Sequence, residues 1–470
     1  MNVFNSICLI ACTIPSLLLG QEIPNDLEQE IQRRVSLDIN PSVSIGILLP
    51  DNEVRFYNYG QYNAQNHQKA DSLTLYEIGS ITKTFTATLC DHHLSKELNT
   101  SLSALFPEID NTHLAKIILS ELRNHIAGMP RLSEQFSPKN WSDPFNGYSD
   151  SLLTIELQAL KPDTSRAWHY SNFGYGVLGK AIEKTTQRAF EDLMGELIHQ
   201  AEMSNTLLKH RSGTTQNLAQ PTNIGTQNSY WHFSGPSRYA GGLVSCTKDL
   251  INYLKYQKNQ HPLFKSASIE QLIQTGIQDL GKDQLFYKDG WFVLKPDSHN
   301  DILLHNGGTG GFTSFIAYNK NTKIGVVILS NAVSLMDDIG LKLIYSAFKL
   351  KRPERTIAYE LADSIERGNV RDLVSKYEKL KNENYPDNIL NIYWLERYFF
   401  GQGNYTVSNQ LSDIMVKVLP DDWEVMDIKG QNLERLKRYK EAAEAYQKAL
   451  LLNPENELLK KKIQYCLKMR

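Results

Sequence analysis

The residues with the clearest chemical potential lie in a short segment that contains a serine and a lysine. Lys83 follows Ser80 by three residues, and apolar residues recur at every fourth position from Ile81 to Leu89. This periodicity predicts a buried helix that begins at Ser80, directly after Gly79. A serine at the positive end of a helix can act as a nucleophile, because free backbone N–H groups there can stabilise an oxyanion. Lys83 shares the helical face, and burial favours a neutral amine that accepts the serine proton.

Other segments with chemically active side chains are less convincing. Two further Ser-x-x-Lys segments begin at Ser245 and Ser346, but they lack the preceding glycine and the helix entry, so both are interpreted as structural. Asp91–His93 is interpreted as solvated surface at the polar end of a helix rather than as a metal site. The sequence contains no His-Glu-x-x-His, Gly-x-Ser-x-Gly or phosphate-loop motif. We therefore expect no metal and no organic cofactor.

Two further motifs each occur once in the chain. Tyr170–Asn172 is the only Tyr-x-Asn sequence, and it precedes a helix-like run. His305–Gly307 is the only His-x-Gly sequence, and it begins a glycine-rich stretch ahead of a predicted strand at Phe312. Each motif alone has a structural explanation, as a helix cap, a buried aromatic or a turn. The three motifs in this order are far more specific than any one of them.

Together the three motifs resemble those of the penicillin-recognising serine hydrolases, specifically the class C β-lactamase-related branch. That branch includes D-alanyl-D-alanine carboxypeptidases and esterases. The resemblance covers about residues 25–350. It extends to the surrounding segments Tyr76–Ser80, Asn124–Pro130, Ala240–Leu243 and Gly290–Phe292.

The resemblance implies roles for the residues of the first two motifs. Ser80 would be the nucleophile and Lys83 its proton partner. Tyr170 would be the base that relays protons to the leaving group, with its phenolate favoured by Lys83 beside it. Asn172 would hold Lys83 and the amide carbonyl of the substrate. His125 is interpreted as a structural neighbour of this site, and so is His169.

The third motif would bind the substrate. His305 would shuttle a proton or meet a substrate carboxylate, and Asn306 is counted with it as a substrate-binding residue. Gly307 would be small so that an acyl chain can lie against the strand. The backbone N–H groups of Ser80 and Gly308 would form the oxyanion hole.

The third motif also departs from the pattern of true β-lactamases in this branch. Those enzymes usually have Lys-Thr-Gly followed by Ser or Thr, which helps to grip the carboxylate of the drug. Here an imidazole is at most partly charged at neutral pH, and Gly308 offers no hydroxyl. This departure favours a peptidase or an esterase over an efficient β-lactamase.

The elements that must position these residues point to an α+β fold. Asn25–Val35 has a helical apolar face, and strand-like runs at 43–49 and 54–59 follow it. Another hairpin is predicted from 312–318 and 323–329, and the region between is predicted to be mainly helical. Strands at both ends of a domain that enclose helices indicate one antiparallel sheet with flanking helices and a helical insertion, as in the β-lactamase/transpeptidase fold.

A change in composition near residue 350 indicates a second domain. The last 120 residues carry 40 charged residues and four glycines, a balance typical of helices. Pro386, Pro420 and Pro454 are 34 residues apart, which is the tetratricopeptide period. Tyr405 and Tyr439 keep the same spacing, and each begins a helix-like run.

We interpret the tail as one good tetratricopeptide repeat preceded by two degenerate ones. The clearest unit has small and aromatic residues where paired helices pack, at Gly430, Leu433, Ala442, Tyr446 and Ala449. Such repeats usually bind a protein partner. The alternative is a helical cap docked on the main domain. On the first interpretation, a chain ending near Leu350 is expected to keep its hydrolytic activity.

The first residues are predicted to direct export. Residues 1–20 carry no charge, and the apolar stretch from Ile7 to Leu19 resembles a secretory signal peptide. Pro15 and the short length argue against an uncleaved membrane anchor. Leu9–Cys12 resembles a bacterial lipoprotein box, but so short a segment before Cys12 favours cleavage over lipidation. The predicted domains are therefore 1–20 signal peptide, 21–350 hydrolase and 351–470 helical repeats, in a periplasmic or secreted bacterial protein.

Composition excludes several other classes of protein. The 470-residue chain has a formal net charge of −2 and no basic run, so nucleic acid is not an expected partner. We predict an exported serine hydrolase that cleaves an amide or ester, such as a D-amino-acid peptide, a β-lactam or a small ester. The membrane would be contacted only through a lipid anchor or an uncleaved leader. The alternative is a non-catalytic ligand-binding or scaffold protein that acts through its repeats.

Overall fold

The structure is a computed structural model, and it describes residues 23–469 except 134–135, 137, 139, 141, 209–214, 267–268, 270 and 278–283. The predicted signal peptide and Cys12 lie outside the described residues. Within the described ranges, no helix is both long and apolar enough to cross a membrane.

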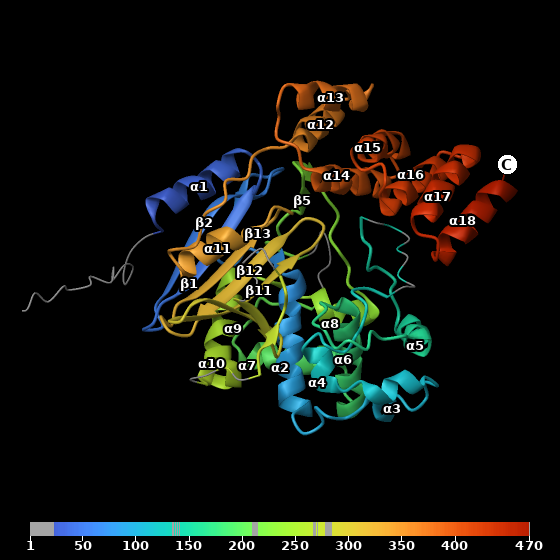
Figure 1. The fold of residues 1–470 in the computed structure, drawn as a ribbon. Helices are drawn as coiled ribbons and strands as arrows, with labels where there is room; N and C mark the ends of the chain where they lie inside the picture. The colour runs from blue at the N-terminus through green and yellow to red at the C-terminus, as the bar shows by residue number, and fades with distance from the viewer. Residues whose placement is uncertain are drawn as a thin grey trace, which may run out of the picture.

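A large antiparallel sheet forms the centre of the first 350 residues (Figure 1). Among the described residues it has nine strands, in the order β3-β2-β1-β13-β12-β11-β10-β9-β8. Its strands are β1 (Ser42–Leu48), β2 (Val54–Asn63), β3 (Gln68–Lys69), β8 (Ile273–Gln274), β9 (Leu285–Lys288), β10 (Trp291–Asp297), β11 (Asn300–Gly308), β12 (Thr313–Asn319) and β13 (Gly325–Ser330). The first strand pairs with the last, with Val43 opposite Ser330. The predicted closure of one sheet by the two ends of the domain is thus confirmed.

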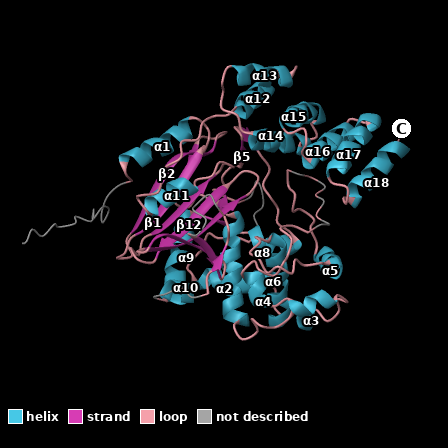
Figure 2. Cartoon of the chain, viewed as in Figure 1, coloured by secondary structure: helices cyan, strands magenta, loops and turns pink. Residues whose placement is uncertain are grey.

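The strands at the centre of this sheet are buried on both sides, because helices cover both of its faces. The helices of this part of the chain are α1 (Asn25–Ser36), α2 (Thr82–Leu94), α3 (Leu102–Leu105), α4 (Leu119–Arg123), α5 (Asp150–Ala159), α6 (Asn172–Thr186), α7 (Phe190–Gln200), α8 (Arg238–Gly241), α9 (Thr247–Gln260), α10 (Pro262–Lys265) and α11 (Asp337–Ile344). One apolar core joins α1 and α11 to one face, and a larger core joins α2, α6 and α9 to the other. Figure 2 shows helices on both sides of the strands.

One part of the sheet differs from the sequence prediction. The region before Phe312 was expected to be mainly helical, yet it contains β8 to β11. The glycine-rich stretch after His305 precedes a strand as expected, since β12 begins at Thr313, but β11 also includes the stretch as far as Gly308. Two short ladders complete the strands: β4 (Tyr76–Glu77) pairs with β7 (Val244–Ser245), and β5 (Thr222–Asn223) pairs with β6 (Thr226–Gln227).

The last part of the chain is helical, as predicted. Its helices are α12 (Ile357–Glu366), α13 (Leu373–Asn382), α14 (Ile389–Gly401), α15 (Tyr405–Val418), α16 (Trp423–Arg435), α17 (Tyr439–Leu452) and α18 (Glu457–Lys468). Two of them begin at the tyrosines that share the 34-residue spacing. A Cβ at Gly430 would lie 2.4 Å from the Tyr446 ring, so the glycine lets α16 and α17 pack closely. The predicted α+β class followed by helical repeats is confirmed.

Candidate active site

Ser80 and Lys83 lie at the start of α2, as the sequence predicts. Ser80 is in a single 3-10 turn, Gly79–Ile81, which leads directly into the helix. The Lys83 amine nitrogen (Nζ) lies 3.0 Å from the Ser80 hydroxyl oxygen (Oγ). Gly79 has a φ of +48°, a conformation that L side chains rarely adopt, so the glycine permits the turn that presents Ser80.

The surroundings of Lys83 favour its neutral form. The side chain is fully buried, and Nζ donates a hydrogen bond of 2.9 Å to the carbonyl oxygen of Ala240 in α8. Burial lowers the pKa of Lys83 well below its usual value, and the positive charge of Arg131 lowers it further. A neutral amine that donates to Ala240 keeps its lone pair available for the Ser80 proton. The Ala240–Leu243 segment therefore holds Lys83 in place through the Ala240 carbonyl oxygen.

Tyr170 lies against both residues. Its ring centroid is 4.8 Å from Lys83 Nζ and 4.5 Å from the centroid of the His125 ring. Burial raises the pKa of Tyr170, while a side-chain hydrogen bond with Ser80 and the charge of Arg131 act in the opposite direction. The expectation that Lys83 favours a phenolate is wrong for this structure, because a lysine made neutral by burial supplies no stabilising charge. Tyr170 is instead suited to donate a proton.

Asn172 does not hold Lys83 in this structure. It is the first residue of α6, and its backbone N–H donates to the Arg131 carbonyl at 2.9 Å. Among the described residues, the hydrogen bonds of Lys83 Nζ go to Ser80 and Ala240 instead. Ala240 occupies the position on the amine that the resemblance gave to the asparagine. The Asn172 side chain is half-buried, and its contact with a substrate carbonyl stays a prediction.

His305 is a neutral, buried residue. Its Nδ1 atom lies 2.7 Å from the carbonyl oxygen of Asn306, and its Nε2 atom has no partner in the described structure. Burial lowers the pKa of His305 to about 3. The imidazole is therefore uncharged near neutral pH and cannot attract a substrate carboxylate as a cation. The expected carboxylate contact is not supported, whereas a role in hydrogen bonding or proton transfer through Nε2 stays a prediction.

Asn306 faces away from the site. Successive strand residues point to opposite faces of a sheet, and the Asn306 side chain donates a 2.6 Å hydrogen bond to Asp337 at the start of α11. The predicted substrate contact for Asn306 is wrong for this reason. Its bond fixes β11 to the helix on the outer face of the sheet.

Gly307 is small for a reason other than the one predicted. A Cβ at this position would lie 2.1 Å from the Ile78 carbonyl oxygen, so the chain's own backbone occupies the space expected for an acyl group. The absence of a side chain lets β11 approach the turn that carries Ser80. As a result, Gly308 lies against Gly79. A Cβ added to Gly79 would be 2.9 Å from the Gly308 backbone nitrogen. This approach brings the two predicted oxyanion-hole residues, Ser80 and Gly308, to neighbouring positions.

Arg131 is a site residue that sequence reasoning missed. Its guanidinium carbon lies 5.4 Å from the centroid of the Tyr170 ring, and its charge lowers the pKa values of Lys83 and Tyr170. Its carbonyl oxygen accepts hydrogen bonds from Asn172 and Phe173, which fixes the chain at the start of α6. The residue directly follows the Asn124–Pro130 segment, and that position was the signal available in the sequence.

His125, His169 and Ser245, which the sequence analysis interprets as structural, each make hydrogen bonds within the fold. His125 is buried and accepts a hydrogen bond of 3.1 Å from the Ser171 N–H, which orients the segment that carries Tyr170. His169 is exposed, and its N–H donates to the His125 carbonyl oxygen. The Ser245 hydroxyl is buried and lies 2.8 Å from that of Thr206. Asp91 departs from the expected solvated surface, because it pairs with the buried Arg123.

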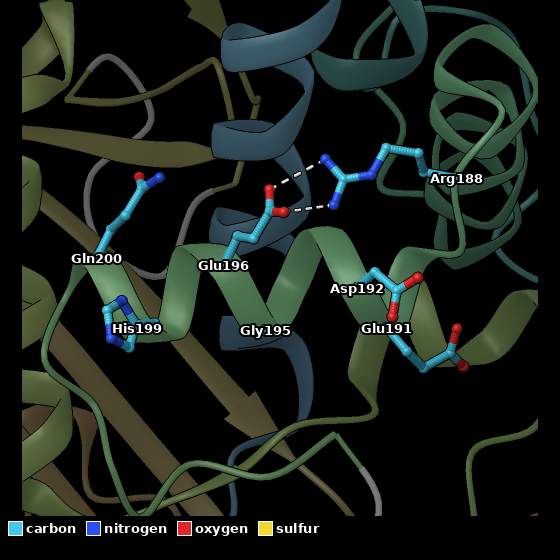
Figure 3. A pocket seen from close by; sticks show the side chains of 7 residues that line it. All are labelled: Arg188, Glu191, Asp192, Gly195, Glu196, His199 and Gln200. Carbon is cyan, nitrogen blue, oxygen red and sulfur yellow. Dashed lines mark hydrogen bonds and ion pairs between the residues drawn. The ribbon is translucent and has the colours of Figure 1, made fainter.

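A hollow on the surface beside α7 contains none of these residues (Figure 3). Its lining is mostly charged, and the dashed lines in Figure 3 mark the ion pair of Arg188 with Glu196. No group of three or more residues in the described ranges has the arrangement of a metal site.

Known proteins resemble this chain in both of its regions. A family model for beta-lactamases matches residues 35–345, and one for tetratricopeptide repeats matches residues 423–456. A beta-lactamase of Lysobacter lactamgenus is 26% identical over 378 residues, which span 70% of this chain and 94% of that protein. Protein flp of Staphylococcus aureus strain MRSA252 is 26% identical over 329 residues, 66% of this chain and 64% of that protein.

Solved structures show the same fold. A class C beta-lactamase matches with a TM-score of 0.59 and 21% identity, over 69% of this chain and 96% of that one. A beta-lactamase/D-alanine carboxypeptidase from Pseudomonas syringae matches with a TM-score of 0.58 and 20% identity, over 69% of this chain and 98% of that one. The two solved chains are thus covered almost completely.

Proposed function

The chain belongs to the beta-lactamase family, and from this membership we propose that it is a serine hydrolase that forms an acyl-enzyme on Ser80. The observation that carries the proposal is the contact of Ser80 with a lysine whose pKa burial lowers. Lys83 Nζ and Ser80 Oγ are 3.0 Å apart, which is within the distance that proton transfer requires. A protein that served only as a scaffold would have no need of this arrangement.

Acylation follows from the protonation states of the three residues. The Ser80 oxygen attacks the carbonyl carbon of the substrate, and the Ser80 proton passes to the neutral Lys83 amine. The N–H groups of Ser80 and Gly308 stabilise the oxyanion. When the tetrahedral intermediate collapses, the bond to the leaving group breaks and Tyr170 donates a proton to it. Lys83 then returns a proton to Tyr170, which restores the starting protonation states of both residues.

Deacylation reverses these roles. Water attacks the acyl ester on Ser80, and its proton passes to the Lys83 and Tyr170 pair. The ester bond breaks, the acid product leaves, and Ser80 recovers its proton. Every group needed for both half-reactions belongs to the chain itself.

The substrate proposed here is an ester or an amide whose binding does not depend on a charged His305. A neutral imidazole in place of the lysine of β-lactamases favours an esterase or peptidase activity over efficient β-lactam hydrolysis. A small ester without a carboxylate fits this chemistry better than a penicillin, which carries one.

The proposal is tested by intact-mass spectrometry and turnover assays of the purified protein. A p-nitrophenyl ester and, separately, a chromogenic cephalosporin are mixed with the protein and with Ser80→Ala. We expect ester turnover and a transient acyl adduct that both disappear in the variant. Turnover that survives in Ser80→Ala would overturn the proposal. Absence of both turnover and adduct with the two substrates in the unmodified protein would favour the scaffold alternative.

We also propose that the protein is exported and that its repeats bind a protein partner. Support comes from the uncharged apolar leader and from the family match to a repeat that commonly mediates protein contacts. Expression with and without the leader, followed by fractionation and N-terminal sequencing, tests export. Recovery of an intact N-terminus from the cytoplasmic fraction alone would contradict it.

A further inference from the structure

The repeat region contacts the hydrolase domain through helix α14. The Asn223 side chain donates a hydrogen bond of 3.3 Å to the Trp394 carbonyl oxygen of this helix. At its end, Gly401 lies so close to another hydrolase loop that a Cβ would be 1.8 Å from the Ser142 hydroxyl. Figure 1 shows β5 beside α14. Two separate loops of the hydrolase domain therefore lie against one repeat helix.

A hydrolase residue completes the core of the repeat region. Ile224, at the tip of the β5–β6 hairpin, is only 2% exposed and packs in the same apolar cluster as α12, α13, α14 and α15. Its φ of +47° is unusual for a β-branched residue and persists only where the surroundings fix it. A two-stranded hairpin this short is not stable alone. The hairpin therefore depends on the repeat region for its conformation.

The base of this hairpin is bonded to the segment that follows Gly308. The Thr222 N–H donates a 3.2 Å hydrogen bond to the Gly311 carbonyl oxygen. The Asn228 side chain donates to the Gly310 carbonyl oxygen. A Cβ at Gly311 would lie 2.3 Å from Pro221, so the two segments are in close contact. The hairpin thus holds the connection between β11 and β12, two and three residues from the predicted oxyanion hole.

The chain that follows the hairpin contacts both the segment that leads to Ser80 and the loop that contains Ser142. The Trp231 N–H donates a 2.8 Å hydrogen bond to Glu77, three residues before the nucleophile. Asp143, next to Ser142, accepts hydrogen bonds of 2.7 and 2.8 Å from His232. The two loops that contact α14 are therefore bonded to each other, and the chain that follows the hairpin is also bonded to the segment before Ser80.

We infer that Ile224 is a positioning residue for catalysis, which couples α14 of the repeat region to the Gly308–Gly311 segment beside Ser80. This inference rests on the proposed hydrolase function. It gives the repeat region a part in the active-site framework, in addition to any partner that the region binds. A partner that shifted α14 would change hydrolysis through the same contacts.

Two matched substitutions test the inference. Ile224→Ala and Ile414→Ala remove the same atoms from the same apolar core, but Ile414 lies in α15 of the repeat region itself, at 0% exposure, whereas Ile224 belongs to the hydrolase hairpin. We expect similar decreases in melting temperature for both. At a temperature where both are folded, we expect Ile224→Ala alone to lower kcat/KM for the p-nitrophenyl ester by about tenfold or more. Ile224→Val should recover most of the rate.

A second measurement is independent of turnover. Amide hydrogen exchange of residues 308–312 should become faster in Ile224→Ala and stay unchanged in Ile414→Ala. Equal rates and equal exchange in the two variants would overturn the inference while leaving the proposed function intact. Absence of Ser80-dependent turnover in the unmodified protein would instead remove the proposed function, and the exchange data would still decide whether Ile224 fixes the segment.

Discussion

Burial determines the protonation states on which the site depends. Lys83 is buried without a carboxylate partner among its described contacts, so its pKa falls and it becomes a base. Tyr170 experiences the same low polarity, which raises its pKa and keeps its hydroxyl protonated. The same cause therefore produces opposite functions in the two residues, a proton acceptor and a proton donor.

Tyr170→Phe tests the proton donor at the residue scale. The substitution keeps the ring and its contacts with His125 and Lys83 but removes the hydroxyl. We expect acylation of Ser80 to slow by about 10²–10⁴-fold, the usual contribution of general acid–base catalysis. Stopped-flow turnover measures the rate, and circular dichroism should show an unchanged melting temperature. An unchanged rate would remove Tyr170 from the mechanism.

Arg131→Gln tests the electrostatic contribution of the residue that the sequence did not identify. The arginine charge lowers the pKa of Lys83, so its removal should raise that pKa. Less neutral amine is then present at any given pH, and the acidic limb of the pH–rate profile should move to higher pH. Arg188→Gln is the matched control, because Arg188 pairs with Glu196 on α7 and does not affect Lys83. A profile that does not move in Arg131→Gln would contradict the assignment.

At the scale of elements, the site depends on the close approach of β11 to the turn before α2. The backbones of Gly307 and Ile78 lie so near each other that no side chain on Gly307 fits between them. The approach requires glycine on the strand and, at Gly79, a glycine that also adopts a positive φ. The proposed oxyanion hole therefore depends on how a strand and a helix entry pack.

Gly307→Ala should disrupt this approach. The added Cβ meets the Ile78 carbonyl at 2.1 Å, so β11 must move away from the Ser80 turn. We expect kcat/KM to fall by about 10²-fold, since displacements of about 1 Å have that effect on catalysis. Gly195→Ala is the control, because nothing lies within 4 Å of its Cβ in helix α7. The control should keep full activity, and equal activity in both variants would exclude the packing argument.

At the scale of the whole molecule, the structure changes the expectation for a shortened chain. The segment after Leu350 is bonded to α1, where the buried Arg34 donates 2.9 Å to the Lys351 carbonyl oxygen. Ile224 and its hairpin are covered by the repeat helices. The repeat region is thus a docked part of the molecule as well as a candidate partner-binding module.

A chain that ends at Leu350 should therefore be less stable and less active than the full chain. Exposure of Ile224 and loss of the Lys351 acceptor should lower the melting temperature by about 5 °C or more. Turnover of the p-nitrophenyl ester should fall at temperatures where the shortened chain is folded. Full activity and an unchanged melting temperature would restore the simpler expectation of independent domains.

The sequence by itself determined the fold class and the repeats, and it identified Ser80, Lys83 and Tyr170 as candidate site residues. The fold class and the repeats follow from strand-like runs at both ends of the domain and from a 34-residue period, whereas the candidate residues follow from three motifs that resemble those of a known family. Such signals are carried by neighbours along the chain and need no tertiary contact to be read.

Only the tertiary structure decided which candidate side chains are buried, what the residues of the third motif contact, and that Ile224 packs in the core of the repeat region. Burial of His305, the Asp337 partner of Asn306 and the Ile78 contact of Gly307 come from segments far away in the sequence. The contact of Ile224 with the repeat core spans more than 130 residues. The physical reason is that burial and close packing are properties of the assembled fold, whereas periodicity and motif spacing are properties of the chain.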